Sequence, residues 1–395
     1  MSQHIAGTKG ALSASTLHAP SLYAVLVLRL TFGLMTLLGA IITFLATSWD
    51  VQWHIFVGRD RTLTAPHLLM LTGIAVGGIG ALLSVIIETT WVKRHPELAK
   101  RLTPFAGIFG APLGAYIAGY AALNAAVAFP LDQYWHTLYG IDVTLWAPFH
   151  VMILSGLALV ALGAAYMLAS TVNLATSLHS VKEKRAAAIG MIVAVATSLS
   201  FFMLLAFNGI DVDNSINLGF VSFSLFPMLA GLLLGSLLVA VAYAAPWRWA
   251  ATSVMAICAL FLIIDQIGVP PAMVWLMQVE QLSYLTVHRS TPPQISVVTI
   301  KWPLLSIVTA ILIDVFFQLA HKYGWSKRLL SMAVAGAVFV SCLPVTIQHP
   351  GATFSLIMAL GVFGVLLSVV TGGFGIFVGT KLGEMIGKTM SRSER

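Results

Sequence analysis

The stretch DVQWHIFVGRDRTLTAPH occupies residues 50–67 and lies between two long apolar segments. A second stretch, DQYWHTLYGIDVTLWAPFH, occupies residues 132–150 and repeats its pattern. The Asp, Trp, His, Gly, Asp and Pro of the first stretch each recur 82 positions later, and its final His recurs 83 positions later. This spacing predicts an internal repeat in which a helix, a polar loop and a second helix follow one another.

The composition excludes an ordinary soluble domain. Hydrophobic residues make up 58% of the 395 residues and charged residues only 9%, whereas a soluble domain carries roughly 25% charged residues. A membrane-spanning helix needs about 20 apolar residues. We therefore predict an all-α polytopic membrane protein with about ten transmembrane helices. The apolar segments are 22–47, 67–92, 104–129, 149–172, 187–207, 218–245, 249–268, 302–321, 328–347 and 353–380.

The distribution of basic residues predicts the orientation in the membrane. If ten spans alternate, sixteen of the 21 Lys and Arg residues fall on the side of the two termini, and four fall on the side of the repeated stretches. Because Lys and Arg are enriched in cytoplasmic loops, we expect cytoplasmic termini and outward-facing stretches, in a bacterial inner membrane. The net charge of +7 lies in short loops between apolar segments, so the expected partner is the lipid bilayer and not nucleic acid.

The repeat also suggests a division of the chain. We expect a polar cytoplasmic N-terminus over residues 1–21 and a duplicated helix-loop-helix metal-site module over residues 22–172. A C-terminal transmembrane module follows over residues 187–380, with no third copy of the repeat, and residues 381–395 form a cytoplasmic tail.

A few ionisable residues fall within or near the apolar segments. Arg29 and Asp314 are expected to face a partner or a cavity, because an isolated charge in the membrane is costly. Glu88 is expected to reach the inner interface, and Asp265 the outer one. The connection 269–301 carries four prolines, which predict a break at its start and an interfacial helix in its middle.

The first stretch combines the ligands of a transition metal. Asp50 and His54 are four residues apart, so on a helix their side chains share one face. Pro66 suits the first turn of the next helix, which places His67 at its start, facing back toward Asp50. One carboxylate and two imidazoles suit copper, iron or zinc, and the ligand types alone leave all three open.

The second stretch offers the same ligand types in Asp132, His136 and His150. Its extra residue is expected to rotate the last side chain by about 100° if it lies on the helix. A single His near a helix end is more often a hydrogen-bonded structural residue, but two copies on one side of a membrane favour metal binding. The residues expected to support the ligands are Arg59, Asp60 and Asp142, since a metal-bound His donates its other ring N–H to such a group. The residues interpreted as loop or surface residues are Asp211, Asp213, His288 and His349.

The first stretch resembles a motif of a known family, the C subunit of the copper membrane monooxygenases, which comprise the particulate methane and ammonia monooxygenases. In that family an Asp, a His four residues later and a His thirteen residues after that bind copper within the membrane. Asp50, His54 and His67 have this spacing, and Arg59 and Asp60 follow as in the family motif.

The second stretch resembles the second metal site of the same family, which has an Asn, a His four residues later and a His fourteen residues after that. Asp132 stands where the family has Asn, and His136 and His150 have the family spacing. The resemblance covers about residues 22–172. It departs from the family at Pro66, which directly precedes the last His of the first stretch.

The resemblance implies a copper-dependent monooxygenase, or a subunit of one, that oxidises a small apolar substrate with O₂. It assigns the reactive centre to Asp50, His54 and His67. It also implies other membrane subunits and an external electron donor. The sequence has no dinucleotide-binding or haem-attachment motif. The alternatives are a transporter or metal-handling protein without redox catalysis and a structural partner in a larger membrane complex.

Overall fold

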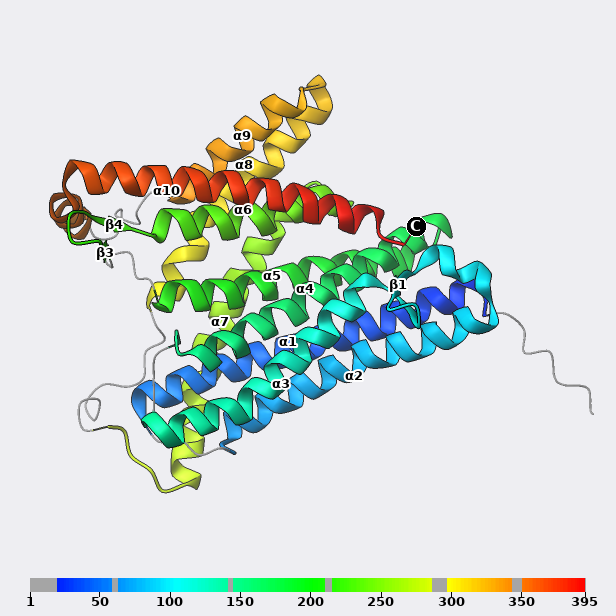
Figure 1. Cartoon of the computed structure of the whole chain (residues 1–395), viewed down its shortest axis with the longest axis horizontal. Helices are drawn as coiled ribbons and strands as arrows, with labels where there is room; N and C mark the ends of the chain where they lie inside the picture. Colours follow the sequence, from blue (N-terminus) through cyan, green and yellow to red (C-terminus); the bar gives the residue numbers. More distant parts are fainter. Residues whose placement is uncertain are drawn as a thin grey trace, which may run out of the picture.

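The computed structural model describes residues 20–58, 63–140, 145–209, 215–285, 297–342 and 350–394. In these ranges the chain forms ten α-helices, one short 3₁₀ helix and two β-hairpins (Figure 1). Nine of the helices in this part of the chain are long and apolar enough to cross a membrane. The predicted all-α membrane architecture is therefore confirmed.

The elements follow the predicted order. The helices are α1 (Leu22–Phe56), α2 (Ala65–Arg94), α3 (Leu113–Tyr139), α4 (Pro148–Ser177), α5 (Val181–Gly209), α6 (Phe226–Ala244), α7 (Ala250–Val279), α8 (Val297–Tyr323), α9 (Lys327–Cys342) and α10 (Pro350–Arg392). The 3₁₀ helix is η1 (Pro96–Arg101), and the antiparallel hairpins are β1 (Thr103–Phe105) with β2 (Phe109–Ala111) and β3 (Ser215–Asn217) with β4 (Ser222–Ser224).

The polar start of each repeated stretch is helical. Helix α1 has 35 residues and is about 52 Å long, whereas the hydrocarbon core of a bilayer is about 30 Å thick. The helix therefore continues past the apolar segment 22–47 and carries residues 50–56 on its last turns. Helix α3 continues past the apolar segment 104–129 in the same way and ends at Tyr139.

Two predicted spans begin too early. Residues 103–111 form the hairpin β1–β2, which turns at Gly107 with a φ of +68°. Residues 215–224 form the hairpin β3–β4. Helix α6 then starts with a proline in its first turn, and α3 starts directly after Pro112. Proline is favoured in the first turn of a helix and disfavoured in its interior, which agrees with both late starts.

The predicted break at the start of the connection 269–301 is wrong. Helix α7 continues through Pro270 and Pro271 to Val279. The flanking residues Met273 and Leu276 pack with Trp53 of α1 in a buried cluster, so neighbouring packing holds the helix together where its hydrogen bonds are lost. The predicted interfacial helix in the middle of the connection falls largely on residues 286–296, which lie outside the described residues.

Glycines allow three pairs of helices to pack closely. A Cβ atom on Gly39 of α1 would lie 2.5 Å from the carbonyl oxygen of Gly73 in α2. A Cβ on Gly163 of α4 would lie 2.6 Å from the backbone nitrogen of Ala118 in α3, and one on Gly231 of α6 would lie 2.7 Å from a backbone nitrogen of α10. Small residues at such positions let the backbones of membrane helices touch.

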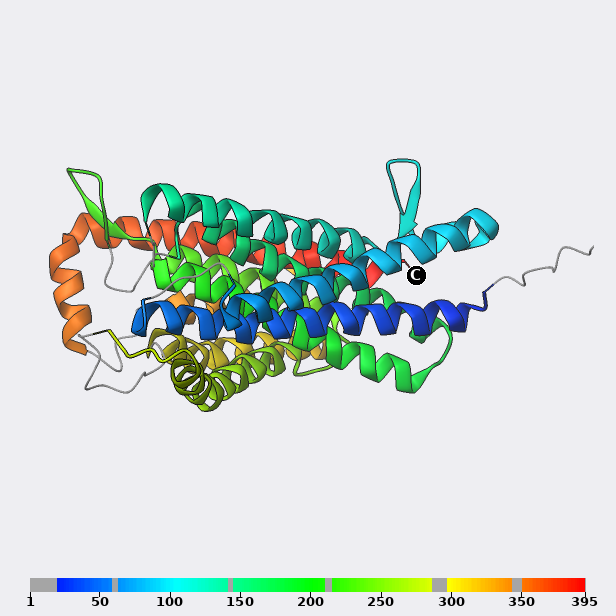
Figure 2. The same cartoon turned by 90° about the horizontal axis from the view of Figure 1, so that it is seen from below.

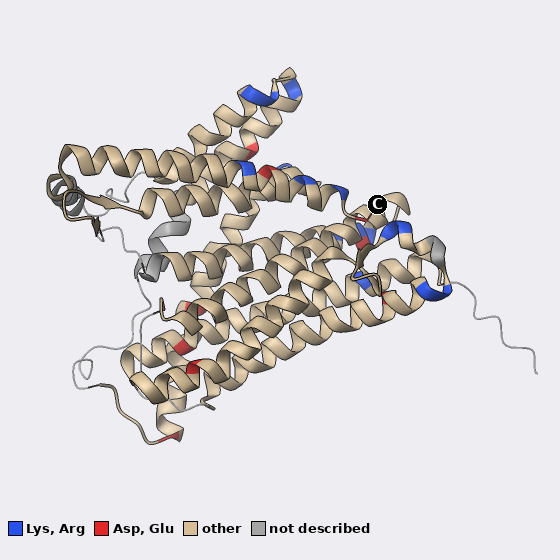
Figure 3. Ribbon diagram, viewed as in Figure 1, with Lys and Arg blue, Asp and Glu red and all other residues tan. Residues whose placement is uncertain are grey.

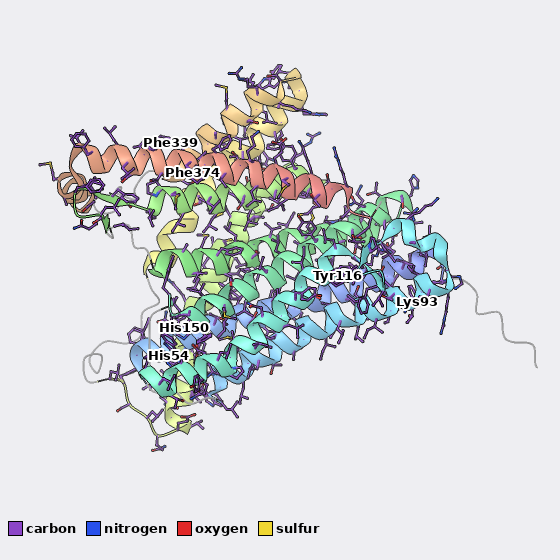
Figure 4. All side chains as sticks on the ribbon, viewed as in Figure 1. His54, Lys93, Tyr116, His150, Phe339 and Phe374 are labelled. Atoms are coloured by element: carbon purple, nitrogen blue, oxygen red, sulfur yellow. The ribbon has the colours of Figure 1, made fainter. Side chains whose placement is uncertain are left out.

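Helices α1 to α4 lie side by side, with α5 along α4, while α6 and α10 form a second close pair (Figures 1 and 2). Most Lys and Arg residues gather near the C-terminus of the chain, at one end of the α1–α4 bundle (Figure 3). We call this the basic end, and Lys93 marks it; His54 and His150 lie at the opposite end, the triad end (Figure 4). The separation agrees with the predicted topology, whose assignment to the two sides of a membrane stays a prediction.

Arg29 and Glu88 form a buried ion pair near the basic end, with side chains only 1% and 2% exposed. Nε and Nη2 of Arg29 donate to one Glu88 oxygen at 3.0 and 2.8 Å. The remaining donors reach Ser170 of α4 at 2.8 Å and the Arg101 carbonyl at 2.7 Å. The prediction that Glu88 reaches the interface is therefore wrong, because Glu88 is buried against a guanidinium that makes four hydrogen bonds and compensates its burial.

The two remaining intramembrane acids also contact other helices. Asp314 of α8 accepts hydrogen bonds from the backbone N–H groups of Ala251 and Thr252, at 3.1 and 2.8 Å, and so caps the start of α7. Asp265 of α7 is 3% exposed and lies beside Ser48 of α1. The expectation that Asp265 reaches the outer interface is wrong, because α7 packs against α1 at this level.

The predicted tail 381–395 is mostly helix, because α10 extends to Arg392. Glu394 accepts hydrogen bonds from the backbone N–H of Leu113 at 2.5 Å and from the Thr103 hydroxyl at 3.1 Å. The carboxylate therefore caps the start of α3, which has no side-chain cap of its own. The division into two modules at residues 172 and 187 stays a prediction.

Candidate metal centre

The first triad consists of Asp50, His54 and His67, at the triad end of α1 and α2. Asp50 and His54 lie one turn apart near the end of α1. Helix α2 begins after Thr64, whose hydroxyl accepts a hydrogen bond from the backbone N–H of His67 at 3.4 Å. With Pro66 in the first turn, the cap fixes His67 as the third residue of α2, and its ring lies beside the end of α1.

The two imidazoles of the first triad face one carboxylate oxygen. Asp50 Oδ1 lies 3.0 Å from Nε2 of His67 and 3.6 Å from Nε2 of His54. The three side chains are 14–15% exposed, so they are shielded from solvent but accessible to an ion.

The second triad consists of Asp132, His136 and His150, at the same end of α3 and α4. Asp132 and His136 lie one turn apart near the end of α3, which includes Pro130. Asp132 Oδ2 lies 3.3 Å from Nε2 of His136 and 3.4 Å from Nε2 of His150. Its other oxygen is buried and has no hydrogen-bond partner among the described residues.

The extra residue of the second stretch does not rotate its last histidine away, contrary to the expectation from helical spacing. Helix α4 begins at Pro148 after the N-cap Ala147, whereas α2 begins at Ala65, one residue before its proline. His150 is therefore the third residue of α4, as His67 is of α2. The connections 57–64 and 140–147 are equally long, and the additional residue lies at the end of α3, which continues seven positions past Asp132 whereas α1 continues six past Asp50. Both histidines therefore keep the same place on their helices.

The ring of His136 is oriented by the end of its own helix. Its Nδ1 lies 3.1 Å from the carbonyl oxygen of Gly140. Because a carbonyl only accepts hydrogen bonds, Nδ1 carries the proton, and in a neutral ring Nε2 then presents a lone pair. That lone pair faces the Asp132 carboxylate at 3.3 Å. Two acceptors this close repel each other unless a proton or a metal cation lies between them.

Gly140 can hold this position only because it is glycine. It is the C-cap of α3, with φ of 86° and ψ of 175°, a backbone region essentially restricted to glycine. Gly58, the corresponding glycine after α1, also has a positive φ, of 65°. The two glycines therefore end their helices directly after the Asp and His pairs.

The distances within each triad fit coordination of one metal ion. Imidazole nitrogen and carboxylate oxygen bind a first-row divalent ion at about 2.0–2.2 Å, so two such ligand atoms lie about 2.9 Å apart at a right angle and about 3.4 Å apart at the tetrahedral angle. The N···O distances of 3.0–3.6 Å overlap this range. In each triad the candidate ligand atoms all lie within 4.8 Å of one another.

A single cavity is lined by both triads; it encloses about 770 Å³, part of which is open to the surroundings. Apolar residues make up much of the remaining wall, and the ring of Phe129 stands edge-on to that of His67 with centroids 6.0 Å apart. We call this space the triad cavity. The other residues that line it are Thr47, Val51, Met70, Gln133, Leu145, Ile153 and Leu154.

Several candidates from the sequence lie outside the described residues. They are Arg59, Asp60, Asp142, Asp211, Asp213, His288 and His349. In the described part, sequence reasoning missed the Gly140 carbonyl as a partner of His136. The signal was present, since a glycine follows each His by four residues at the end of a helix, but we interpreted these glycines only as turn residues. Met70 and Phe129 were missed because they are ordinary apolar residues of a span.

Comparison with known proteins adds no assignment: no protein-family model, no curated protein and no solved structure matches this chain.

Proposed function

We propose that the two triads bind copper and that the protein is a membrane-bound, copper-dependent monooxygenase or a subunit of one. The observation that carries this proposal is the convergence of two imidazole nitrogens on one carboxylate oxygen, twice, around one cavity. The choice of copper rests on the resemblance in ligand spacing to the C subunit of the copper membrane monooxygenases, since imidazole and carboxylate ligands also suit iron and zinc.

The duplication of the two triads belongs to the same proposal. Each begins with an Asp and a His at the end of one helix and finishes with a His at the third position of the next. A duplicated helix-loop-helix unit over residues 22–172 explains this common geometry.

The proposed reactive centre is the triad of Asp50, His54 and His67, which has the family spacing without substitution. Copper bound there supplies the activation of O₂. The protein supplies three ligands from two helix ends and a cavity wall that admits an apolar C–H group and excludes bulk water, through residues such as Met70 and Phe129.

Monooxygenation of a substrate R–H consumes O₂, two electrons and two protons and yields R–OH and water. The electrons come from an external two-electron donor, such as a membrane quinol, because the sequence has no flavin, nicotinamide or haem motif. The second triad, Asp132, His136 and His150, would hold a further copper ion, and its side chains line the same cavity.

The alternative of a transporter or metal-handling protein depended on Arg29, Asp265 and Asp314 as charges along a path. In the structure Arg29 is paired with Glu88, and Asp314 caps α7. These two residues therefore serve helix packing, which weakens the case for a transport path along them.

Copper stoichiometry of the purified protein in lipid nanodiscs tests the proposal. We expect two copper ions per chain, one in the His54→Ala/His67→Ala variant and one in the His136→Ala/His150→Ala variant. His321→Ala, which alters an exposed histidine on α8, is the matched control and keeps both ions. Unchanged copper content in the two double variants would refute the assignment.

Oxidation of a test alkane by the copper-loaded protein with a quinol donor separates the catalytic claim from metal binding. Transport of copper into liposomes, without any oxidation product, would instead support the metal-handling alternative.

A further inference from the structure

An apolar groove runs along the outside of the contact between α2 and α3. It encloses about 1220 Å³, part of which is open to the surroundings. Its lining extends on α2 from Ile74 to Ile86 and on α3 from Ala115 to Ala126, and the hairpin β1–β2 contributes aromatic side chains at the basic end. Figure 4 shows Tyr116, which lines the groove, toward this basic end.

Small residues line the groove beside bulky exposed ones. Ala81 and Ala122 are almost fully buried, and a Cβ on Gly119 would lie 4.0 Å from that of Ala81. Leu82 and Leu123 are 54% and 60% exposed. The result is a narrow channel with apolar sides, and none of the described residues that line it is charged.

The groove has the length of one alkyl chain. The thirteen residues from Ile74 to Ile86 rise about 18 Å along α2. One leaflet of a bilayer, which is half of a core about 30 Å thick, has a similar depth. An extended hydrocarbon chain therefore fits along the groove.

One end of the groove adjoins the triad cavity. On α2, Ile74 of the groove follows Met70 of the cavity by one turn, and on α3, Ala126 of the groove precedes Phe129 of the cavity by less than one turn. One helical turn rises about 5.4 Å, so a wall of about this thickness separates the two spaces. Phe129 is also the ring that contacts His67.

We propose that this groove binds a single linear alkyl chain from the bilayer, with its terminal methyl group at Ile74 and Ala126, next to the triad cavity. A free chain fits better than the tail of a phospholipid, because the lining has no charged group to recognise a headgroup and because its end adjoins the triads. Movement of Met70, whose side chain is flexible and 3% exposed, would open the wall.

This inference rests on the proposed function, because it names the alkyl chain as the substrate of the proposed oxygenase. A linear alkane or a related chain is then oxidised at its end, as R–CH₃ + O₂ + 2 e⁻ + 2 H⁺ → R–CH₂OH + H₂O, with the external donor as reductant. Occupancy of the groove does not depend on any metal.

Photo-crosslinking of the metal-free protein in nanodiscs tests the inference. The probe is a dodecane that carries a diazirine at its terminal carbon, and mass spectrometry locates the adducts. We expect adducts at Met70, Ile74, Ala126 and Phe129, and we expect excess dodecane to suppress them.

A matched pair of glycine variants tests the site itself. Gly119→Leu fills part of the groove and removes the contacts of about two methylene groups of the probe. The crosslinking yield at a subsaturating probe concentration should therefore fall about tenfold. Gly373→Leu adds the same side chain to an exposed face of α10, where a Cβ would meet nothing within 4 Å, and leaves the yield unchanged.

Two results would overturn the inference. The first is a crosslinking yield at Met70, Ile74, Ala126 and Phe129 that is no higher than the yield at the exposed Val370 and Phe374 of α10. The second is labelling of the same residues by a phosphatidylcholine with a terminal diazirine that excess dodecane does not displace, which would assign the groove to a phospholipid. Both measurements use metal-free protein, so loss of the copper assignment would leave the groove result standing.

Discussion

Replacement of Gly140 by alanine should weaken metal binding at the second triad and leave the first triad intact. Gly140 combines φ of 86° with ψ of 175°, and a side chain in this region costs about 1–3 kcal/mol. The backbone relieves that strain by rotating, which moves the carbonyl that lies 3.1 Å from Nδ1 of His136. Loss of such an orienting partner lowers metal affinity about 10- to 100-fold.

The assay is a competitive titration of Cu(II) against a chelator, followed by electron paramagnetic resonance. It is carried out on the His54→Ala/His67→Ala background, where only the second triad remains, and repeated on the His136→Ala/His150→Ala background. Gly219→Ala is the control, because Gly219 has a similar φ of 89° in an exposed hairpin and a Cβ there would meet nothing within 4 Å. Equal affinity in Gly140→Ala and the parent, or an equal loss at both triads, would refute the reasoning.

Three further predictions concern the packing that positions the triads, each measured by unfolding or exchange in nanodiscs. Arg29→Met should destabilise the protein by about 3–5 kcal/mol, because it leaves Glu88 charged and buried. The double variant Arg29→Met/Glu88→Leu should recover most of this loss. A double variant as unstable as the single one would contradict the role of the ion pair. Gly163→Leu should lower the free energy of unfolding by about 1–3 kcal/mol, because its Cβ would lie 2.6 Å from the backbone of Ala118. Gly336→Leu, where a Cβ would meet nothing within 4 Å, should be neutral. Similar thermal midpoints for the two variants would argue against close packing of α3 and α4. Asp314→Asn should lower the free energy of unfolding by about 1–2 kcal/mol and speed hydrogen exchange at the amides of Ala251 and Thr252. Unchanged exchange at these amides would show that Asp314 does not cap α7.

Much of the fold follows from the sequence because the bilayer constrains it strongly. A run of about 20 apolar residues has few alternatives to a helix in a membrane, and the predicted spans all lie on or overlap helices. The errors lie where the bilayer constraint ends. Apolar content does not distinguish the hairpin at 103–111 from the start of a helix, and it does not show that α7 continues through Pro270 and Pro271.

The local part of the candidate site could also be predicted. Asp50 and His54 share a helix, and Pro66 marks the start of the next one, so spacing and capping place these residues and His67 together. The same reasoning failed for His150, because its position is set by the residue at which α4 begins, and helical periodicity does not define that residue.

Long-range partners could not be predicted. Arg29 and Glu88 are 59 positions apart, and no local pattern pairs them. The role of the Gly140 carbonyl depends on the exact end of α3, which sequence patterns do not define to within one residue.

X-ray absorption at the copper edge of the loaded protein tests most directly whether each triad is a metal-binding site. We expect nitrogen and oxygen neighbours only, at about 2.0–2.2 Å, with the outer-shell scattering of two imidazoles per copper ion. A spectrum dominated by sulfur at about 2.3 Å, or one without imidazole scattering, would place the metal elsewhere and contradict this expectation.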